Sequence, residues 1–302
     1  MINKLKILIT GGAGFIGSHI VDGYIKAGHK VAIIDNLSTG FRRNINPKAK
    51  FYQADIRDLK RVLNIFKKEK PAIVNHHAAI AEVVKSVKNP MPTFETNVPG
   101  TANVLLAFGK YGKGSGRKFI FSSSGGAIYG QPKKIPANEN ELINPLSPYG
   151  LSKFLGEEVI KFYSRQYEFD YLIFRYPNVY GPRQNPKGEA GVVAIFSGLM
   201  RRGKRPVIYG DGSKTRDYVY VDDIVRANII GLRKGKNDIF NLGWGKEIKD
   251  RMIFDILAKE LGFKEKPVYA AFRPGEVVRI SLDAKKIRKA LGWTPKVEFG
   301  MF

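Results

Sequence analysis

Tyr149 and Lys153 lie four residues apart in the segment SPYGLSK at 147–153. Side chains at that spacing share one face of a helix, one turn apart. A free phenol has a pKa of about 10 and is a poor base at neutral pH, but a nearby ammonium group favours its ionised form. The pair therefore predicts a general base that takes a proton from a hydroxyl group. An ordinary surface pair on an amphipathic helix is the alternative.

A glycine-rich segment lies near the start of the chain. Gly11, Gly14 and Gly17 are spaced three residues apart in TGGAGFIG at 10–17. Missing side chains let the turn close and let the backbone approach a pyrophosphate, and the following helix offers N–H groups to the phosphates. Because an apolar segment precedes the glycines and a helical pattern follows them, the segment predicts a dinucleotide site rather than a merely tight turn.

Asp35 closes the second apolar segment. At this place a carboxylate accepts hydrogen bonds from the hydroxyls of the adenosine ribose and repels a 2′-phosphate. The sequence therefore favours NAD over NADP. Arg42 and Arg43 follow in the next loop and would argue for NADP, but we interpret them as solvated loop cations.

Apolar segments alternate with helical patterns, and these elements must position the residues above. We expect strands at residues 4–10, 30–36, 49–56, 72–79, 117–124 and 171–179. We expect helices at residues 15–28, 58–70, 101–112 and 153–167. Strands that are almost wholly apolar and alternate with helices imply a parallel sheet covered on both faces. With right-handed crossovers, the fold class is α/β, a doubly wound Rossmann fold.

The regular alternation of strands and helices ends at about residue 180, where a loop-like segment at 181–191 is followed by shorter elements. We expect residues 1–180 to form the dinucleotide-binding Rossmann domain. Residues 181–302 should form mainly a smaller lobe that binds the substrate.

The composition limits the class of protein. The 302 residues include 51 Lys and Arg, 27 Asp and Glu and no Cys, and the formal net charge is +24. No apolar run approaches the roughly 20 residues that span a bilayer, and the start lacks the apolar core of a signal peptide. We expect a cytoplasmic protein with no membrane partner. The charge invites a nucleic-acid role, but the basic residues are spread over the length, so we expect no specific nucleic-acid partner.

His76 and His77 are the adjacent histidines of the chain. They lack further ligands at metal spacing, so we interpret them as structural residues and expect no metal site.

A set of short motifs runs through nearly the whole chain. They are TGGAGFIG at 10–17, DNLSTG at 35–40, DI at 55–56, HAA at 77–79, NVPGT at 97–101, SSS at 122–124, YG at 129–130, SPYGLSK at 147–153, FRYPNVYGPRQ at 174–184, RDYVYVDD at 216–223 and RPGE at 273–276. In this order and spacing they resemble the extended short-chain dehydrogenase/reductase family, in its branch of NAD-dependent epimerases and dehydratases.

The resemblance implies NAD as the cofactor. The pyrophosphate and the adenosine half would contact Gly11, Gly14, Phe15, Ile16, Gly17, Asp35, Asn36, Ser38, Thr39, Gly40, Asp55 and Ile56. The nicotinamide half would contact Ala78, Ala79, Ile80, Asn97, Ser122, Tyr149, Lys153 and Tyr176.

The resemblance also implies a UDP-sugar substrate, of the UDP-glucose or UDP-galactose type. This substrate would be held by Asn178, Arg216, Arg273 and Glu276, and the side chains of Arg216 and Arg273 can make bidentate contacts to its diphosphate. The implied reaction is C4 epimerisation through a transient 4-keto sugar, with Tyr149 as the base and Lys153 beside it. Relatives imply a homodimer that pairs the helices at about 90–111 and 147–167.

The segment SSSGGAIYG at 122–130 departs from the family pattern. The usual Ser or Thr that binds the reacting hydroxyl falls on Gly125, so we expect the neighbouring Ser124 to serve as the third catalytic residue. The segment has no acid to drive an elimination, which favours an epimerase over a dehydratase.

Several alternatives stay open at this point. The chain could epimerise UDP-N-acetylglucosamine or UDP-glucuronate, or act as a dehydratase. A non-catalytic NAD-binding or RNA-binding protein is a rival of another class, which retention of both Tyr149 and Lys153 argues against. We expect the wall near Ile280 and Ser281 to decide whether an N-acetyl group fits.

Overall fold

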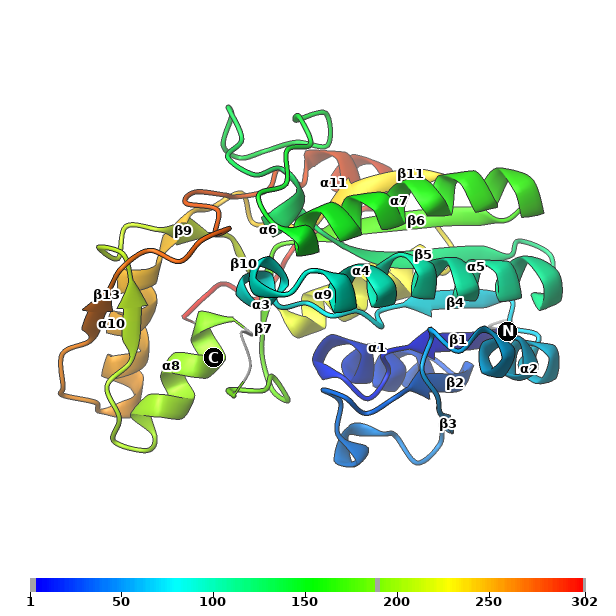
Figure 1. Cartoon of the computed structure of the whole chain (residues 1–302), viewed down its shortest axis with the longest axis horizontal. Coiled ribbons are helices and arrows are strands. Elements are labelled where there is room, and N and C mark those ends of the chain that lie inside the picture. The colour runs from blue at the N-terminus through cyan, green and yellow to red at the C-terminus, as the bar shows by residue number, and fades with distance from the viewer. Residues whose placement is uncertain (1–3, 188–190, 301–302) are drawn as a thin grey trace.

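A parallel sheet forms the centre of the larger part of the molecule (Figure 1). The computed structural model describes residues 4–187 and 191–300. Seven strands lie in the order β11-β6-β5-β4-β1-β2-β3. Their bounds are β1 Lys6–Thr10, β2 Lys30–Asp35, β3 Lys50–Gln53, β4 Ile73–His76, β5 Lys118–Ser124, β6 Asp170–Tyr176 and β11 Asp238–Asn241. The predicted doubly wound fold is thus confirmed, with the order turning back between β1 and β4.

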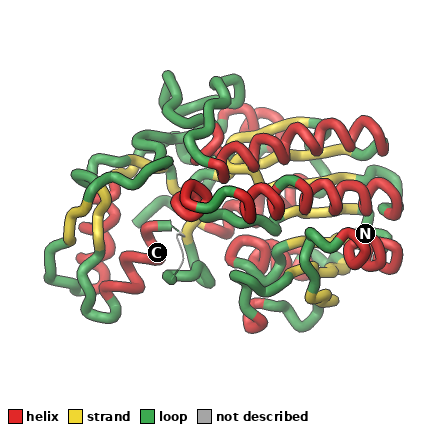
Figure 2. The backbone as a smooth tube through the Cα atoms, viewed as in Figure 1, coloured by secondary structure: helices red, strands yellow, loops and turns green. Residues whose placement is uncertain are grey.

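Helices cover both faces of this sheet (Figure 2). One face is covered by α1 Phe15–Lys26, α9 Val221–Gly231 and α11 Lys285–Leu291. The other is covered by α2 Leu59–Glu69, α5 Pro99–Tyr111 and α7 Pro148–Tyr167, with α4 Met91–Asn97 beside them. Two apolar cores result, one between each helical layer and the sheet, and they hold the carboxyl edge of the strands rigid.

Two elements differ from the sequence-based prediction for physical reasons. Pro177 lacks an N–H group, and the strand expected at 171–179 divides there into β6 and β7, Asn178–Tyr180. Helix α7 begins at Pro148, before the expected residue 153, because Ser147 caps it by accepting a hydrogen bond from the Gly150 N–H at 3.1 Å. Tyr149 therefore lies inside the first turn of the helix.

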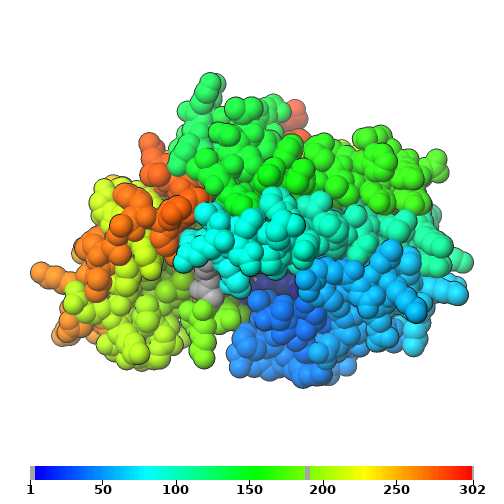
Figure 3. Space-filling model, viewed as in Figure 1, coloured from blue at the N-terminus to red at the C-terminus, as the bar shows by residue number. Residues whose placement is uncertain are grey.

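A smaller lobe stands at the carboxyl edge of the sheet, at the left of Figure 1. It contains α8 Val192–Met200, α10 Asp250–Leu261 and the paired strands β8 Val207–Tyr209 and β13 Val268–Ala270, around a third apolar core. The two parts lie against each other in the space-filling view (Figure 3). The chain beyond residue 181 also supplies β11, α9 and α11 to the larger part, so the boundary at residue 180 stays a prediction.

Short elements complete the connections. They are the 3₁₀ helix η1 Arg42–Asn44, α3 Val83–Lys88, α6 Gly125–Ile128, β9 Thr215–Arg216, β10 Tyr218–Tyr220 and β12 Ile248–Lys249. Within residues 4–187 and 191–300, no helix combines the length and the apolar character needed to cross a membrane.

Candidate active site

The glycine loop between β1 and α1 is closed too tightly for side chains. Gly11 has a positive φ of 70°, and a Cβ atom there would lie 2.7 Å from the Ala78 nitrogen. A Cβ atom at Gly17 would lie 2.2 Å from the Gly11 carbonyl oxygen. Gly14 begins α1 without a side-chain cap, so the N–H groups of the first turn point to the loop. This bare cradle fits the pyrophosphate of a dinucleotide.

Asp35 lies at the end of β2, beside this loop, and is nearly buried. Its two carboxylate oxygens accept hydrogen bonds from the Ala13 N–H at 2.9 Å and the Leu37 N–H at 2.8 Å. These bonds fix the carboxylate at the edge where an adenosine ribose would lie. Arg42, which would favour NADP, donates instead to the Gln53 side chain at 2.7 Å.

The residues expected at the adenine form a polar cluster. Asn36 donates to Asp55 at 3.0 Å, and hydrogen bonds from the Arg57 side chain lower the pKa of Asp55 to about 2. Asp55 is therefore an anion fixed beside the ribose loop. Its predicted contact with the adenine stays a prediction.

Asn97 ties the loop after β4 to helix α7. Its side chain accepts from the Ile80 N–H at 2.8 Å, donates to the Ile80 carbonyl at 3.0 Å and donates to the Ser152 hydroxyl at 2.9 Å. Asn97 is buried. The loop expected to line the nicotinamide is thus held at a fixed place relative to Tyr149, which also lies on α7.

The two adjacent histidines are engaged in hydrogen bonds. His76 lies between the Thr10 hydroxyl at 2.6 Å and the Thr101 hydroxyl at 2.9 Å. His77 lies 3.2 Å from the hydroxyl of Tyr176, and burial lowers the pKa of His77 to about 3. Both rings are therefore neutral at physiological pH.

Tyr176 is held by a residue that sequence reasoning missed. Its hydroxyl accepts a hydrogen bond from the Asn228 side chain at 2.9 Å, and burial raises the pKa of Tyr176. Asn228 lies on α9, far from Tyr176 in the chain. The pattern VDDIVRAN at 221–228 shows it only as one polar residue of a half-buried helix.

Tyr149, Lys153 and Ser124 are brought together at the carboxyl end of β5. The Lys153 ammonium group is buried and donates to the Ser122 carbonyl at 2.8 Å. Burial lowers the pKa of Lys153 to about 8, while the charge of Glu157 raises it. The hydroxyls of Ser124 and Tyr149 are hydrogen-bonded to each other.

The pKa of Tyr149 differs from the sequence-based expectation. Burial raises the pKa of the phenol, and the hydrogen bond with Ser124 acts in the opposite direction. The sequence predicts a lowered pKa for Tyr149, but in the folded chain the pKa is raised, because burial outweighs the hydrogen bond with Ser124. A positive charge on the far side of the phenol is needed to favour the ionised form.

The position where the family carries Ser or Thr is packed against the Leu282 side chain in this chain. A Cβ atom at Gly125 would lie 2.4 Å from Cδ1 of the buried Leu282, so a side chain at position 125 would require Leu282 to move. Gly126 is open towards the cavity, where the nearest atom to a Cβ would be the Asn178 side-chain oxygen at 3.5 Å. Ser124 supplies the hydroxyl beside Tyr149 instead.

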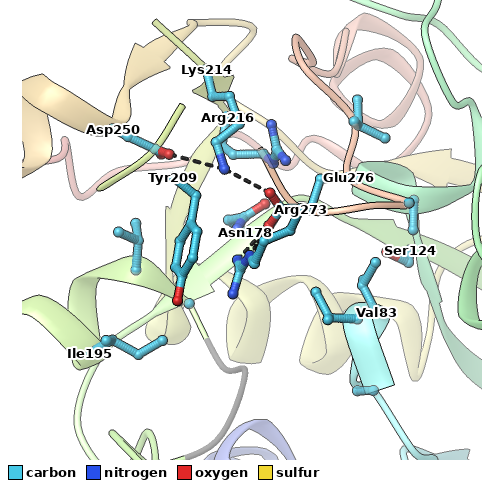
Figure 4. Close-up of a pocket in the computed structure, with 18 of the residues that line it drawn as sticks. Val83, Ser124, Asn178, Ile195, Tyr209, Lys214, Arg216, Asp250, Arg273 and Glu276 are labelled. Carbon is cyan, nitrogen blue, oxygen red and sulfur yellow. Dashed lines mark hydrogen bonds and ion pairs between the residues drawn. The ribbon is translucent and has the colours of Figure 1, made fainter. Parts of the chain in front are cut away.

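A cavity of about 290 Å³ runs from this group into the smaller lobe (Figure 4). Ser124 and Tyr149 line it. The four residues expected to bind the UDP-sugar also line it: Asn178, Arg216, Arg273 and Glu276. Arg273 donates to Glu276 at 3.1 Å through Nε, and its guanidinium carbon lies 4.2 Å from the centre of the Tyr209 ring.

Lys214 and Asp250 are pocket residues that sequence reasoning missed. Lys214 is buried between two carboxylates, 2.8 Å from Glu276 and 3.5 Å from Asp250 (Figure 4). Lys214 and Arg216 lie two residues apart, and side chains at that spacing along an extended chain point to the same side. Because Arg216 was expected in the site, this spacing could have identified Lys214 as a second residue of the site. Together with Arg273, the lining contains three cationic and two acidic side chains. The excess positive charge suits a diphosphate.

The wall expected at Ile280 and Ser281 is corrected by the structure. Both residues are buried, with exposed fractions of 2% and 0%, and neither lines the cavity. That segment contributes Gly275, Glu276 and Val277 instead.

Comparisons with known proteins agree with this geometry. The model of the NAD dependent epimerase/dehydratase family matches residues 7–243. A putative UDP-glucose 4-epimerase of Methanocaldococcus jannaschii is 51% identical, over 97% of this chain and 94% of the relative. The structure of a UDP-glucose 4-epimerase of Thermotoga maritima with UDP-glucose superposes with a TM-score of 0.95 at 47% identity, covering 98% of this chain and 95% of that one. The Thermus thermophilus UDP-glucose 4-epimerase in complex with NAD has a TM-score of 0.92 at 40% identity, covering 98% and 95%.

A bare glycine loop at the carboxyl edge of a parallel sheet, with a Tyr and a Lys one turn apart beside it, defines a Rossmann-fold enzyme that uses a nicotinamide dinucleotide. The family model covers most of the residues, and strong relatives are epimerases. The chain belongs to the NAD-dependent epimerase/dehydratase family. It is therefore an enzyme of the epimerase type with NAD as its cofactor, and the resemblance drawn from the motifs is confirmed.

Proposed function

We propose that this enzyme inverts C4 of a UDP-sugar of the UDP-glucose or UDP-galactose type, through a transient 4-keto sugar. One observation carries the proposal: Ser124 and Tyr149 line the same cavity as Arg216 and Arg273. A diphosphate bound by the two guanidinium groups would direct the attached sugar to the phenol.

The chain's own residues supply the proton transfer. NAD, held by the glycine loop and Asp35, would supply reversible hydride transfer from C4 and back to the other face of the sugar. Tyr149 takes the proton from the 4-hydroxyl and later gives it back, and Ser124 orients that hydroxyl. Lys153 keeps a positive charge close to the phenol. Arg216 and Arg273 hold the UDP part while the keto sugar turns over.

The lining favours epimerisation over dehydration. An elimination needs an acid close to the sugar, and Gly125 and Gly126 supply none. Among the described residues, the carboxylates that line the cavity are Asp250 and Glu276. Both are paired with Lys214.

A panel of substrates tests the proposal and separates its rivals. The enzyme with NAD is incubated with UDP-glucose, UDP-galactose, UDP-N-acetylglucosamine, UDP-glucuronate and dTDP-glucose, and the products are separated by chromatography and identified by NMR. We expect interconversion of UDP-glucose and UDP-galactose with no net change in NAD. A 4-keto-6-deoxy product from dTDP-glucose would instead identify a dehydratase. Turnover of UDP-N-acetylglucosamine or UDP-glucuronate alone would change the assigned sugar.

A homodimer is part of the proposal, and an exposed apolar stripe on α7 supports it. Leu151 and Phe162 are exposed on one face of that helix, with fractions of 39% and 55%, and Met91 at the start of the neighbouring α4 is 58% exposed. Two such faces could pair about a twofold axis as a four-helix contact. The cytoplasmic location also belongs to the proposal, on composition alone.

A further inference from the structure

Three consecutive serines at the end of β5 hold three successive turns of α7. The Ser122 carbonyl accepts from Lys153 at 2.8 Å, and the Ser124 hydroxyl is hydrogen-bonded to Tyr149. Between them, the Ser123 hydroxyl donates to Glu157 at 2.5 Å. Tyr149, Lys153 and Glu157 follow each other at intervals of four residues on one face of the helix. Of the three, Glu157 is the residue for which the proposed reaction gives no role.

Glu157 is a fully buried carboxylate, with an exposed fraction of 0%. Arg175 of β6 binds it through both oxygens, at 2.9 Å from Nε and 2.6 Å from Nη2. A buried ion pair is weak evidence for a stabilising role, because the loss of hydration offsets much of the attraction. Its geometry is nevertheless strict, since a bidentate pair fixes the distance and the orientation of both side chains.

The hydrogen bonds continue from Arg175 to the end of β11 and on to the segment after Glu276. Arg175 donates to the Tyr129 hydroxyl at 2.8 Å, and that hydroxyl donates to Asn241 at 2.8 Å. Asn241 donates to the Ala137 carbonyl at 3.0 Å. The backbone of Ala137 then pairs with Ser281 at 2.8 Å, in the segment that carries Glu276. One chain of contacts therefore joins the helix of Tyr149 to the segment whose residues Arg273 and Glu276 line the cavity.

We propose that Glu157 is a positioning residue of the reaction, which sets helix α7 against β5 and supplies the negative charge that keeps Lys153 an ammonium group beside Tyr149. This inference rests on the proposed function. Glu157 touches neither the sugar nor the cofactor in this account; it acts through Lys153 and through the serines of β5.

The charges around Lys153 give the expected direction. On its own helix the charge of Glu157 acts on Lys153. Burial lowers the pKa values of His76, at the end of β4, and of His77, the next residue, and the charge of Lys153 lowers them further. Burial lowers the pKa of Lys153 to about 8, and Glu157 raises it. Removing the charge of Glu157 must therefore lower the pH at which Lys153 loses its proton.

Glu157→Gln is the first variant, because it keeps the shape of the side chain and removes the charge. We expect kcat to fall about 10- to 100-fold, as for a displaced acid–base group, while KM for the UDP-sugar changes less than about threefold. The alkaline limb of the pH–rate profile should move down by roughly half a unit or more. Ser123→Ala removes the hydrogen bond to Glu157 but keeps the ion pair of Glu157 with Arg175. It should therefore lower kcat and shift the alkaline limb in the same direction, but by less.

Glu69→Gln is the matched control. Glu69 is also a buried carboxylate, paired with Lys6 at 3.1 Å and Lys50 at 2.7 Å, but it lies at the opposite edge of the sheet. Both Gln variants should lower the melting temperature. The control should leave kcat and the pH–rate profile at the wild-type values, since a merely structural carboxylate has no path to Lys153.

A titration of Lys153 itself separates this inference from the proposed function. The protein is labelled at the lysine Cε atoms, the NMR signal of Lys153 is assigned with Lys153→Met, and its midpoint is measured with and without Glu157→Gln. We expect a lower midpoint in the variant whether or not a UDP-sugar is turned over. An unchanged midpoint overturns the inference, as does a wild-type pH–rate profile in a folded variant. Absence of turnover in the wild type on every UDP-sugar would reject the proposed function alone.

Discussion

Gly17→Ala should weaken the binding of NAD and leave the cavity for the substrate unchanged. The added methyl carbon would lie 2.2 Å from the Gly11 carbonyl oxygen, whereas ordinary contacts begin at 3.4 Å, so the loop or the helix must move by about 1.2 Å. Hydrogen bonds from N–H groups to phosphate oxygens need about 2.9 Å. A shift of that size breaks at least one such bond to a charged group, worth about 1.5–3 kcal/mol, or roughly a tenfold to hundredfold loss in affinity.

Gly28→Ala is the control for this experiment. Gly28 also has a positive φ, of 87°, but nothing lies within 4 Å of the site of its Cβ. That change should cost about 1 kcal/mol of stability and leave NAD affinity unchanged. Calorimetric titration of NAD into the wild type and both variants measures the difference. If Gly17→Ala binds NAD as tightly as the wild type, the glycine loop is not the phosphate site and the placement of the cofactor fails.

Three further predictions concern the cofactor, the core and the assembly. Asp35→Asn should reduce the ratio of NAD affinity to NADP affinity by about tenfold, because it removes the charge that repels a 2′-phosphate. Titration with both cofactors checks this, and a wild type that prefers NADP would contradict it. Burial raises the pKa of Glu69, but the hydrogen bonds from Lys50, Tyr52 and Lys6 together outweigh it, and the pKa is about 2 against 4.5 in a free side chain. Its ionised form therefore stabilises the fold above about pH 4.5, by on the order of 3 kcal/mol, and this contribution is lost as the pH falls towards 2. The gap in melting temperature between the wild type and Glu69→Gln should shrink over that range, and a constant gap would refute the assignment. Phe162→Glu should produce a monomer by light scattering, whereas Leu142→Glu, on a loop and 69% exposed, should not; a monomeric wild type at micromolar concentration would reject the dimer.

Much of the fold could be predicted because local patterns and tertiary packing agree. Five of the six expected strands contain an observed one, and the sixth, at 171–179, overlaps β6 and β7, since buried parallel strands are almost wholly apolar. The seventh strand, β11, was missed. Its sequence DIFN is short and polar at both ends, and its place depends on pairing with β6, from Ile239 beside Ile173 to Asn241 beside Arg175. Such a pairing depends on residues far apart in the chain.

The site could be predicted where a motif carries the chemistry within a few residues. The glycine loop and the Tyr–Lys pair are of this kind. Lys214 was missed because its partner Glu276 lies 62 residues further along the chain. Glu157 was missed for a similar reason: only the fold brings Arg175 and Ser123 to it. The pKa of Tyr149 was misjudged because spacing along a helix shows the ammonium group but not the burial that opposes it.

The phenol of Tyr149 is the centre of this account, and one substitution tests it most directly. Turnover of UDP-galactose to UDP-glucose, or of whichever UDP-sugar proves active, is measured for the wild type, Tyr149→Phe and Tyr269→Phe. Tyr269→Phe is the control, because it removes the same hydroxyl group from an exposed tyrosine. Tyr149→Phe should lower kcat by about 10²–10⁴-fold while NAD and UDP-sugar bind almost as before, and Tyr269→Phe should behave as the wild type. Lys153→Met should also slow turnover and should move the acidic limb of the pH–rate profile upward, since the ionised phenol loses its cation. Full turnover in Tyr149→Phe, or an acidic limb that stays in place when Lys153 is lost, would contradict the mechanism.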